Sequence, residues 1–181
     1  MTMALRCDSG WRATLVKSYP DLFHAENDPL AAEGWPAVED GWRDLLERAC
    51  KRIRAAVRAD GGPFRATQVK EKYGSLRFYW SGRLSPTATA LIEEAIELAE
   101  ARSATTCEIC GEPGRLFGGG WLTTRCAVHA EDRPAVPVDE GFENLYVDHR
   151  RVGGRWLPRY RFYDRDTDRF VEAGRPRRKG K

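Results

Sequence analysis

The sequence of 181 residues has no long apolar run, and 31% of its residues are charged. No stretch approaches the roughly 18 apolar residues that a membrane-spanning helix needs. Residues 1–8 also lack the apolar stretch of a secretion signal. Hydrophobic residues nevertheless make up 41% of the chain, and 6 Trp, 6 Tyr and 7 Phe can fill a core. We therefore expect a folded, soluble, cytoplasmic protein that does not contact a membrane.

Motifs for common enzyme chemistries are also missing. There is no G-x-S-x-G nucleophile elbow, and the glycine runs at 61–62 and 118–120 do not match the phosphate-binding G-x-x-x-x-G-K-[ST]. The H-x-E and P-C-x-x-C pair of a zinc deaminase is absent as well. We assign no catalytic residue, and the sequence favours a protein that is not an enzyme.

Five cysteines are present, an odd number that argues against a disulfide framework. Three of them and a histidine form the pattern C-x2-C-x15-C-x2-H, made by Cys107, Cys110, Cys126 and His129. Two turns of this kind have the spacing of a tetrahedral zinc site, and a Cys3His set is typical of structural Zn2+. The alternative is a redox C-x-x-C with an unrelated cysteine and histidine. Cys7 and Cys50 are expected to be small buried residues.

Hydrophobic periodicity predicts an α+β fold. Apolar residues recur at helical spacing over 41–59, with Asp40 as the expected N-cap, and a shorter helix is expected over 11–19. Strand alternation predicts a β-hairpin at 65–81 with its turn at residues 73–75. A second long helix is expected to start at Pro86, with Ser85 as its cap. Its apolar face is Leu91, Ile92, Ala95, Ile96 and Ala99, and its acidic face, expected to be solvated, is Glu93, Glu94, Glu97 and Glu100.

The same patterns divide the chain into four segments. We expect an α+β body at 1–102, a zinc-ribbon-like knuckle module at 103–132, a basic aromatic hairpin segment at 133–173 and a disordered basic tail at 174–181. The hairpin is expected from alternation at 156–163, an acidic turn at 164–168 and a returning strand at 169–173.

Four motifs resemble a family of uncharacterised small zinc-knuckle proteins of bacteria, phages and prophages. They are D-G-W at 40–42, Q-V-K-E-K-Y-G-S-L-R-F-Y at 68–79, C-E-I-C-G-E-P-G at 107–114 and G-W-L-T-T-R-C at 120–126, followed by His129. The resemblance covers roughly residues 8–130. It implies a bacterial or phage origin and supports the same four zinc ligands, but it implies no activity.

Charge is distributed unevenly along the chain. The net charge is +3, yet residues 141–181 hold 12 Lys/Arg against 6 Asp/Glu, whereas residues 1–140 hold 18 against 21. Basic side chains interleaved with aromatic ones are typical of nucleic-acid binding. The candidate residues are Arg150, Arg151, Arg155, Arg159, Arg161, Trp156 and Tyr160. The alternative is that these arginines pair with neighbouring aspartates such as Asp148 and are only structural.

The leading functional hypothesis is a non-catalytic, zinc-stabilised accessory protein that binds another protein. Its candidate partner-binding residues are Tyr73, Arg77 and Tyr79 on one face of the 65–81 hairpin. Nucleic-acid binding through the basic segment is the second hypothesis. The third is a nuclease-like hydrolase with His149 as its base, because Asp148-His149 followed by Gly153-Gly154 resembles the start of an HNH-type nuclease motif. The later Asn and His of that motif are missing. The sequence indicates neither the identity of a partner nor an oligomeric state.

Overall fold

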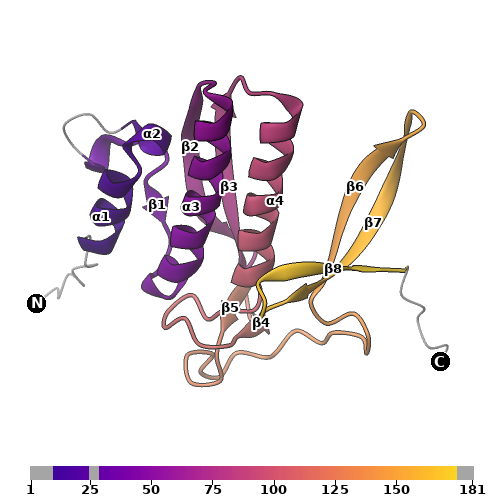
Figure 1. Ribbon diagram of the computed structural model, residues 1–181. Coiled ribbons are helices and arrows are strands. Elements are labelled where there is room, and N and C mark those ends of the chain that lie inside the picture. The colour runs from indigo at the N-terminus through magenta and orange to yellow at the C-terminus, as the bar shows by residue number, and fades with distance from the viewer. Residues whose placement is uncertain (1–9, 25–28, 175–181) are drawn as a thin grey trace, which may run out of the picture.

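The structure is a computed structural model that describes residues 10–24 and 29–174. Within these residues it has four α-helices and eight strands in three small sheets, which confirms the α+β class (Figure 1). The helices are α1 (Gly10–Ser18), α2 (Pro20–Phe23), α3 (Arg43–Asp60) and α4 (Pro86–Ser103). The strands are β1 (Pro36–Ala37), β2 (Phe64–Lys72), β3 (Ser75–Gly82), β4 (Arg115–Phe117), β5 (Thr123–Arg125), β6 (Leu145–Val152), β7 (Arg155–Asp164) and β8 (Arg169–Ala173). Two short 3-10 helices, η1 (Pro29–Ala31) and η2 (Asp40–Trp42), precede α3.

The first sheet has the order β1-β2-β3, and its central pair is the predicted hairpin. Tyr73 and Gly74 both have positive φ, 57° and 80°, at the turn between β2 and β3. Two successive residues of positive φ match the right-handed twist of the strands, which is why this short connection favours a hairpin. Helices α3 and α4 lie side by side against the sheet (Figure 1).

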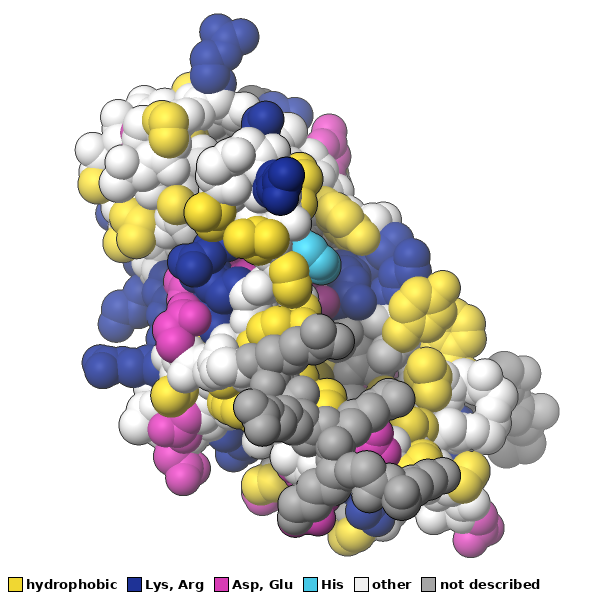
Figure 2. Space-filling model, turned by 90° about the vertical axis from the view of Figure 1, so that its right-hand side faces the viewer, with side chains coloured by type: hydrophobic (Ala, Val, Ile, Leu, Met, Phe, Trp, Pro, Cys, Tyr) yellow, Lys and Arg dark blue, Asp and Glu magenta, His cyan; other side chains and the backbone are white. Residues whose placement is uncertain are grey.

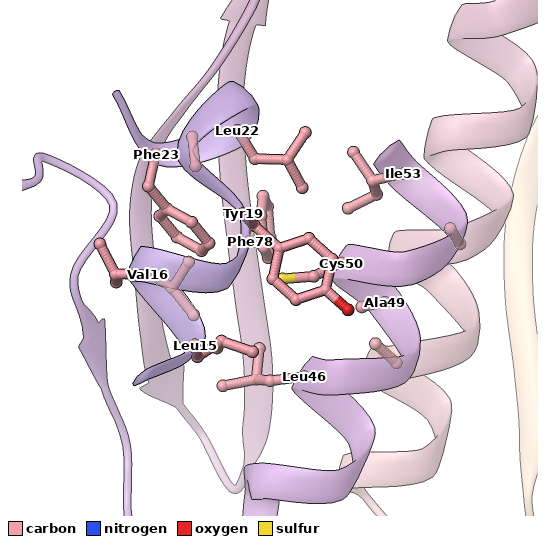
Figure 3. Packing of buried hydrophobic residues seen from close by; sticks show 14 of the residues in the cluster. Leu15, Val16, Tyr19, Leu22, Phe23, Leu46, Ala49, Cys50, Ile53 and Phe78 are labelled. Carbon is pink, nitrogen blue, oxygen red and sulfur yellow. The ribbon is translucent and has the colours of Figure 1, made fainter. Parts of the chain in front are cut away.

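The main core fills the space between the helices and the first sheet. Side chains from α1, α2, α3 and β3 converge there, among them Leu15, Phe23, Ile53 and Phe78 (Figure 3). Cys50 lies inside this cluster with no exposed surface, and burial raises the pKa of its thiol. Its prediction as a buried structural residue is confirmed, whereas Cys7 lies outside the described residues.

Helix α3 begins and ends close to the predicted positions, and α4 begins at the predicted Pro86. Helix α3 ends at Gly61, whose left-handed φ of 79° lets its amide donate to the carbonyl of Val57. In α4 the Ser85 hydroxyl accepts from the amide of Ala88 at 3.2 Å, as expected of an N-cap. The prediction of Asp40 as the cap of α3 is wrong. Asp40 instead accepts from the Trp11 indole and pairs with Arg12.

Both predictions about the faces of α4 are wrong only in part. Leu91 was expected in the core but is exposed, while Ile92 and Ala95 are buried. The acidic face was expected to be solvated, but Glu97 and Glu100 are covered by the C-terminal sheet and carry ion pairs with arginines. Tyr163, Tyr146 and Phe170 of that sheet form a second, smaller cluster with Leu98 and Ala101 of α4.

The C-terminal sheet contains the two expected strands, β7 and β8, and one strand that the sequence pattern did not predict. Strand β6 pairs with β7 along its whole length, from Leu145 opposite Phe162 to Val152 opposite Arg155. Strand β8 pairs only with the second half of β7. The rest of the β6–β7 hairpin is therefore two-stranded and extends away from α4 (Figure 1). We call residues 149–158 the distal arm.

Candidate metal centre and binding surfaces

The four predicted ligands converge at one point. The sulfur atoms of Cys107, Cys110 and Cys126 and a ring nitrogen of His129 all lie within 4.8 Å of one another. The Cys110 and Cys126 sulfurs are 3.8 Å apart, and the Cys107 sulfur is 3.6 Å from Nδ1 of His129. A regular tetrahedron with Zn–S bonds of about 2.3 Å and a Zn–N bond of about 2.0–2.1 Å has edges of about 3.8 Å and 3.6 Å. These residues can hold a metal ion.

Local backbone turns aim the ligands at this point. The amide of Cys107 donates to the carbonyl of Glu112, and the amide of Gly111 donates back to the carbonyl of Cys107. Gly111 has a φ of 81°, a conformation that glycine adopts without strain. The hairpin β4–β5 then returns the chain so that Cys126 follows β5 directly. The backbone N–H of His129 donates to the Cys126 sulfur and lowers the pKa of that thiol to about 6. This environment favours the thiolate that a metal requires.

Two glycines of the body, Gly41 and Gly74, form close contacts with the knuckle module. The amide of Gly41 donates to the carbonyl of Glu108 at 2.7 Å, and a Cβ at Gly41 would collide with the carbonyl oxygen of Cys107. At the turn of the first hairpin, Gly74 accepts a bond of 2.6 Å from the Thr124 hydroxyl on β5. The D-G-W and K-Y-G-S motifs thus lie at the contacts between body and knuckle.

Two of the three predicted partner-binding residues are exposed. Tyr73 is 60% exposed and Tyr79 is 44% exposed. Arg77, in contrast, forms an ion pair with Glu100 of α4 and donates to the carbonyl of Leu76. Its guanidinium connects β3 to α4. This hairpin therefore exposes one tyrosine at its turn, Tyr73 with Lys72 over its ring, and one on β3, Tyr79 with Lys70 over its ring.

The predicted nucleic-acid-binding arginines fall into two groups, and two of them are structural. Arg161 is 1% exposed, and its guanidinium contacts Glu94 at 2.7 Å, Asp148 at 2.6 Å, and Glu97. Arg159 pairs with Asp148 at 2.6 Å. Their charges are neutralised inside the interface between the C-terminal sheet and α4, so these two residues are removed from the candidate set. Tyr160 is half-buried beside them.

The pKa values of the acidic groups at this interface are shifted by burial and by the arginines that pair with them. Burial raises the pKa of Glu97, although its hydrogen bond from Arg161 acts in the opposite direction. Burial also raises the pKa of Asp148, but the hydrogen bond from Arg159 and the charge of Arg161 outweigh it, so that this pKa is lowered. The arginine pair therefore keeps Asp148 ionised while it holds the sheet on the helix.

The second group lies on the distal arm and is exposed. Arg150, Arg151 and Arg155 are all exposed, and Trp156 is 68% exposed. The distal arm contains no Asp or Glu. On the side of the molecule shown in Figure 2, Lys/Arg and hydrophobic side chains gather around a histidine. Arg151 lies opposite Trp156, and Arg150 lies opposite Leu157 on the other face of the hairpin, so cations project from both faces.

His149 and Asp148 point to opposite faces of β6, because neighbouring residues of a strand alternate. Asp148 lies on the face toward α4, bonded to Arg159 and Arg161, while His149 lies on the other face opposite Pro158. The carboxylate therefore cannot orient the imidazole as a general base would require.

Together, the fold and the site define an α+β protein in which a knuckle with a Cys3His cluster that can hold a metal ion is docked on the body. No family model matches the chain, and no curated protein or solved structure matches it. Within the described residues, none of the helices is both long enough and apolar enough to cross a membrane.

Proposed function

We propose that the protein is a non-catalytic nucleic-acid-binding protein whose knuckle is held by structural Zn2+ and whose distal arm contacts the ligand. The observation that carries the proposal is the acid-free distal arm, with three exposed arginines and an exposed Trp156. Arginine side chains that neutralise phosphates release counterions, which makes binding favourable and dependent on salt.

The shape of the arm supports this choice. A two-stranded β-ribbon fits the major groove of duplex DNA, and cations on both of its faces can reach the phosphates of both strands. Trp156 could instead stack on an unpaired base. We include both duplex and single-stranded probes in the test for this reason.

Zinc is the metal that the ligand set supports best. Three thiolates and one imidazole in a tetrahedral arrangement are typical of structural Zn2+ sites, in which no position is left open for a substrate. We assign to this metal the stabilisation of the knuckle and no chemical step. Cytoplasmic location and bacterial or phage origin stay predictions.

Fluorescence anisotropy with labelled duplex DNA, single-stranded DNA and RNA tests the proposal. The variant R150A/R151A/R155A should bind at least about tenfold more weakly and show a shallower salt dependence. The matched control is R43A/K51A/R83A, which removes three exposed cations outside the arm. The assignment to the arm would be contradicted if both triple variants lost the same affinity for nucleic acid. It would also be contradicted if neither variant changed the affinity at low salt.

Truncation after Gly174 distinguishes binding by the arm from binding by the basic residues 175–181, which lie outside the described residues. If the truncated chain binds as well as the whole chain and still loses affinity in the arm variant, the tail is not required. Loss of all binding upon truncation alone would instead assign the contact to the tail and overturn the proposal.

A protein partner at the first hairpin is the second candidate function. The exposed Tyr73 at its turn and the exposed Tyr79 on β3 favour it, since aromatic side chains are enriched in protein interfaces. Affinity capture from a bacterial lysate, followed by quantitative comparison of the wild type with Y73S/Y79S, tests it. A protein recovered equally by both would not bind this surface.

A further inference from the structure

A cleft of about 660 Å³ lies between the body and the knuckle module. Its volume is within the range of about 300–1,000 Å³ that is typical of ligand sites. Its walls include two tryptophans and three glutamates, from segments that are far apart in the sequence: Trp35, Trp121, Glu39, Glu71 and Glu108. The cleft is far in sequence from the distal arm, and none of the residues assigned to nucleic-acid binding lines it.

Trp121 is held in place although it is 64% exposed. Its indole N–H donates to Glu71 at 3.2 Å, and its carbonyl accepts from Arg133 at 3.2 Å. Gly119 and Gly120 precede it with φ of 90° and 107°, so the backbone of this loop depends on glycine. An exposed indole that is fixed in this way loses little side-chain entropy when it binds a partner, and this is a feature of binding hot spots.

The charges in the cleft are not balanced. Arg125 pairs with Glu108 at 3.0 Å, and Arg12 pairs with Asp40 and donates to the carbonyl of Val38. Both arginines of the lining are therefore engaged by other groups of the protein. Glu39 is exposed, and Glu71 accepts from the amide of Gly74 and the indole of Trp121. Among the described residues neither carboxylate has an ion pair with a cation, so both face the cleft without a counterion.

We propose that this cleft binds an organic cation, the guanidinium side chain of an arginine in a peptide segment. An aromatic ring attracts a cation through its negative face, most strongly for tryptophan, and the guanidinium also stacks on such a face. The carboxylates of Glu39 and Glu71 supply acceptors for its N–H groups. The same negative lining would repel a phosphate, so this site selects a ligand of charge opposite to that of the distal arm's ligand.

The site depends on the metal centre because its walls come from two parts of the chain. Glu39 and Glu71 belong to the body, whereas Trp121 and Glu108 belong to the knuckle module. The contacts at Gly41 and Gly74 hold these parts together. Chelation of the metal should therefore abolish peptide binding.

Isothermal titration calorimetry with acetyl-Gly-Arg-Gly-Arg-Gly-amide and with the same peptide carrying citrulline tests the proposal. Citrulline has the shape of arginine without its charge. The arginine peptide should bind at least about tenfold more tightly than the citrulline peptide. Equal affinity for the two peptides, or no binding of either, would overturn the proposal.

Two variants locate the site. Trp121→Ala and E39Q/E71Q should each weaken binding of the arginine peptide by about tenfold or more. Gln at position 71 keeps an oxygen that accepts from Gly74. The matched control E93Q/D166N removes two exposed carboxylates elsewhere and should bind as the wild type does.

Trp121→Phe distinguishes lost recognition from a misfolded knuckle, because it keeps an aromatic face and loses the indole N–H. It should bind more tightly than Trp121→Ala, with unchanged metal content in both. Equal binding by the wild type and Trp121→Ala would contradict the site. R150A/R151A/R155A should bind the peptide normally, so failure here is separate from failure of the nucleic-acid proposal.

Discussion

Arg161 and Arg150 occur in the same sheet, yet only Arg150 offers its charge to the solvent. Arg161 lies opposite Tyr146, on the face of the sheet that packs on α4, and three carboxylates surround it. Arg150 lies on the same face but beyond the reach of β8, in the two-stranded arm. A residue's distance along the hairpin decides here whether an arginine stabilises the fold or can bind a ligand.

Arg161→Met should destabilise the protein by about 3 kcal/mol, because removal of one partner leaves buried carboxylates without a counterion. Urea unfolding, followed by tryptophan fluorescence, measures this loss. Arg155→Met is the control, since Arg155 is exposed on the arm, and it should change the free energy of unfolding by less than about 0.5 kcal/mol. Similar stability of the two variants would contradict a structural role for Arg161.

At the scale of elements, the knuckle and the body are joined by backbone contacts that only glycine permits. The carbonyl of Cys107 and the amide of Gly111 approach Gly41 so closely that a side chain has no room. Gly41 lies in η2, immediately before α3, so the position of the knuckle is set by the start of one of the two long helices of the body. A substitution of Gly41 therefore affects both the start of α3 and the position of the knuckle.

Gly41→Ala should therefore destabilise the protein by about 1–3 kcal/mol through overpacking, and it should weaken metal binding. Thermal unfolding and competition with a chromogenic chelator measure the two effects. Gly118→Ala is the control within the same module, because a Cβ there would meet its neighbours only at 3.8 Å or beyond. If both variants retain the metal equally well, the contact at Gly41 does not position the knuckle.

At the scale of the whole molecule, residues 10–24 and 29–174 form three small sheets that are connected through α4. The helix packs against β3 on one side, leads into Cys107 at its C-terminal end, and carries the glutamates that hold β7. The knuckle and the C-terminal sheet are thus both attached to the C-terminal half of α4.

Removal of the metal should unfold mainly residues 103–132, because metal binding supplies the folding free energy of a segment with little core of its own. Hydrogen exchange followed by mass spectrometry should show loss of protection there and at the docking contacts around Gly41 and Gly74. Protection of α3 should persist, since its core does not include the knuckle. A knuckle that remains protected after chelation would contradict a structural role for the metal.

Much of the fold was predictable because it depends on local patterns. The spacing of Cys107, Cys110, Cys126 and His129 predicted the ligand cluster, and the periodicity around Ile53 predicted α3. Strand β6 was missed because charged residues such as Arg150 and Arg151 interrupt its alternation. The cleft was missed as well, although the glycine run before Trp121 was a signal that this loop has an unusual backbone.

The amino-acid sequence by itself determined most of the elements and the Cys3His cluster, since helical periodicity, turn residues and ligand spacing act over short stretches of chain. Only the tertiary structure decided which charges are available. Arg161 is neutralised by Glu94 and Glu97, residues far away in the sequence, whereas Arg150 and Arg151 are not. The cleft at Trp121 likewise exists only after body and knuckle have docked. Both outcomes depend on desolvation and close packing between distant segments, which no local pattern encodes.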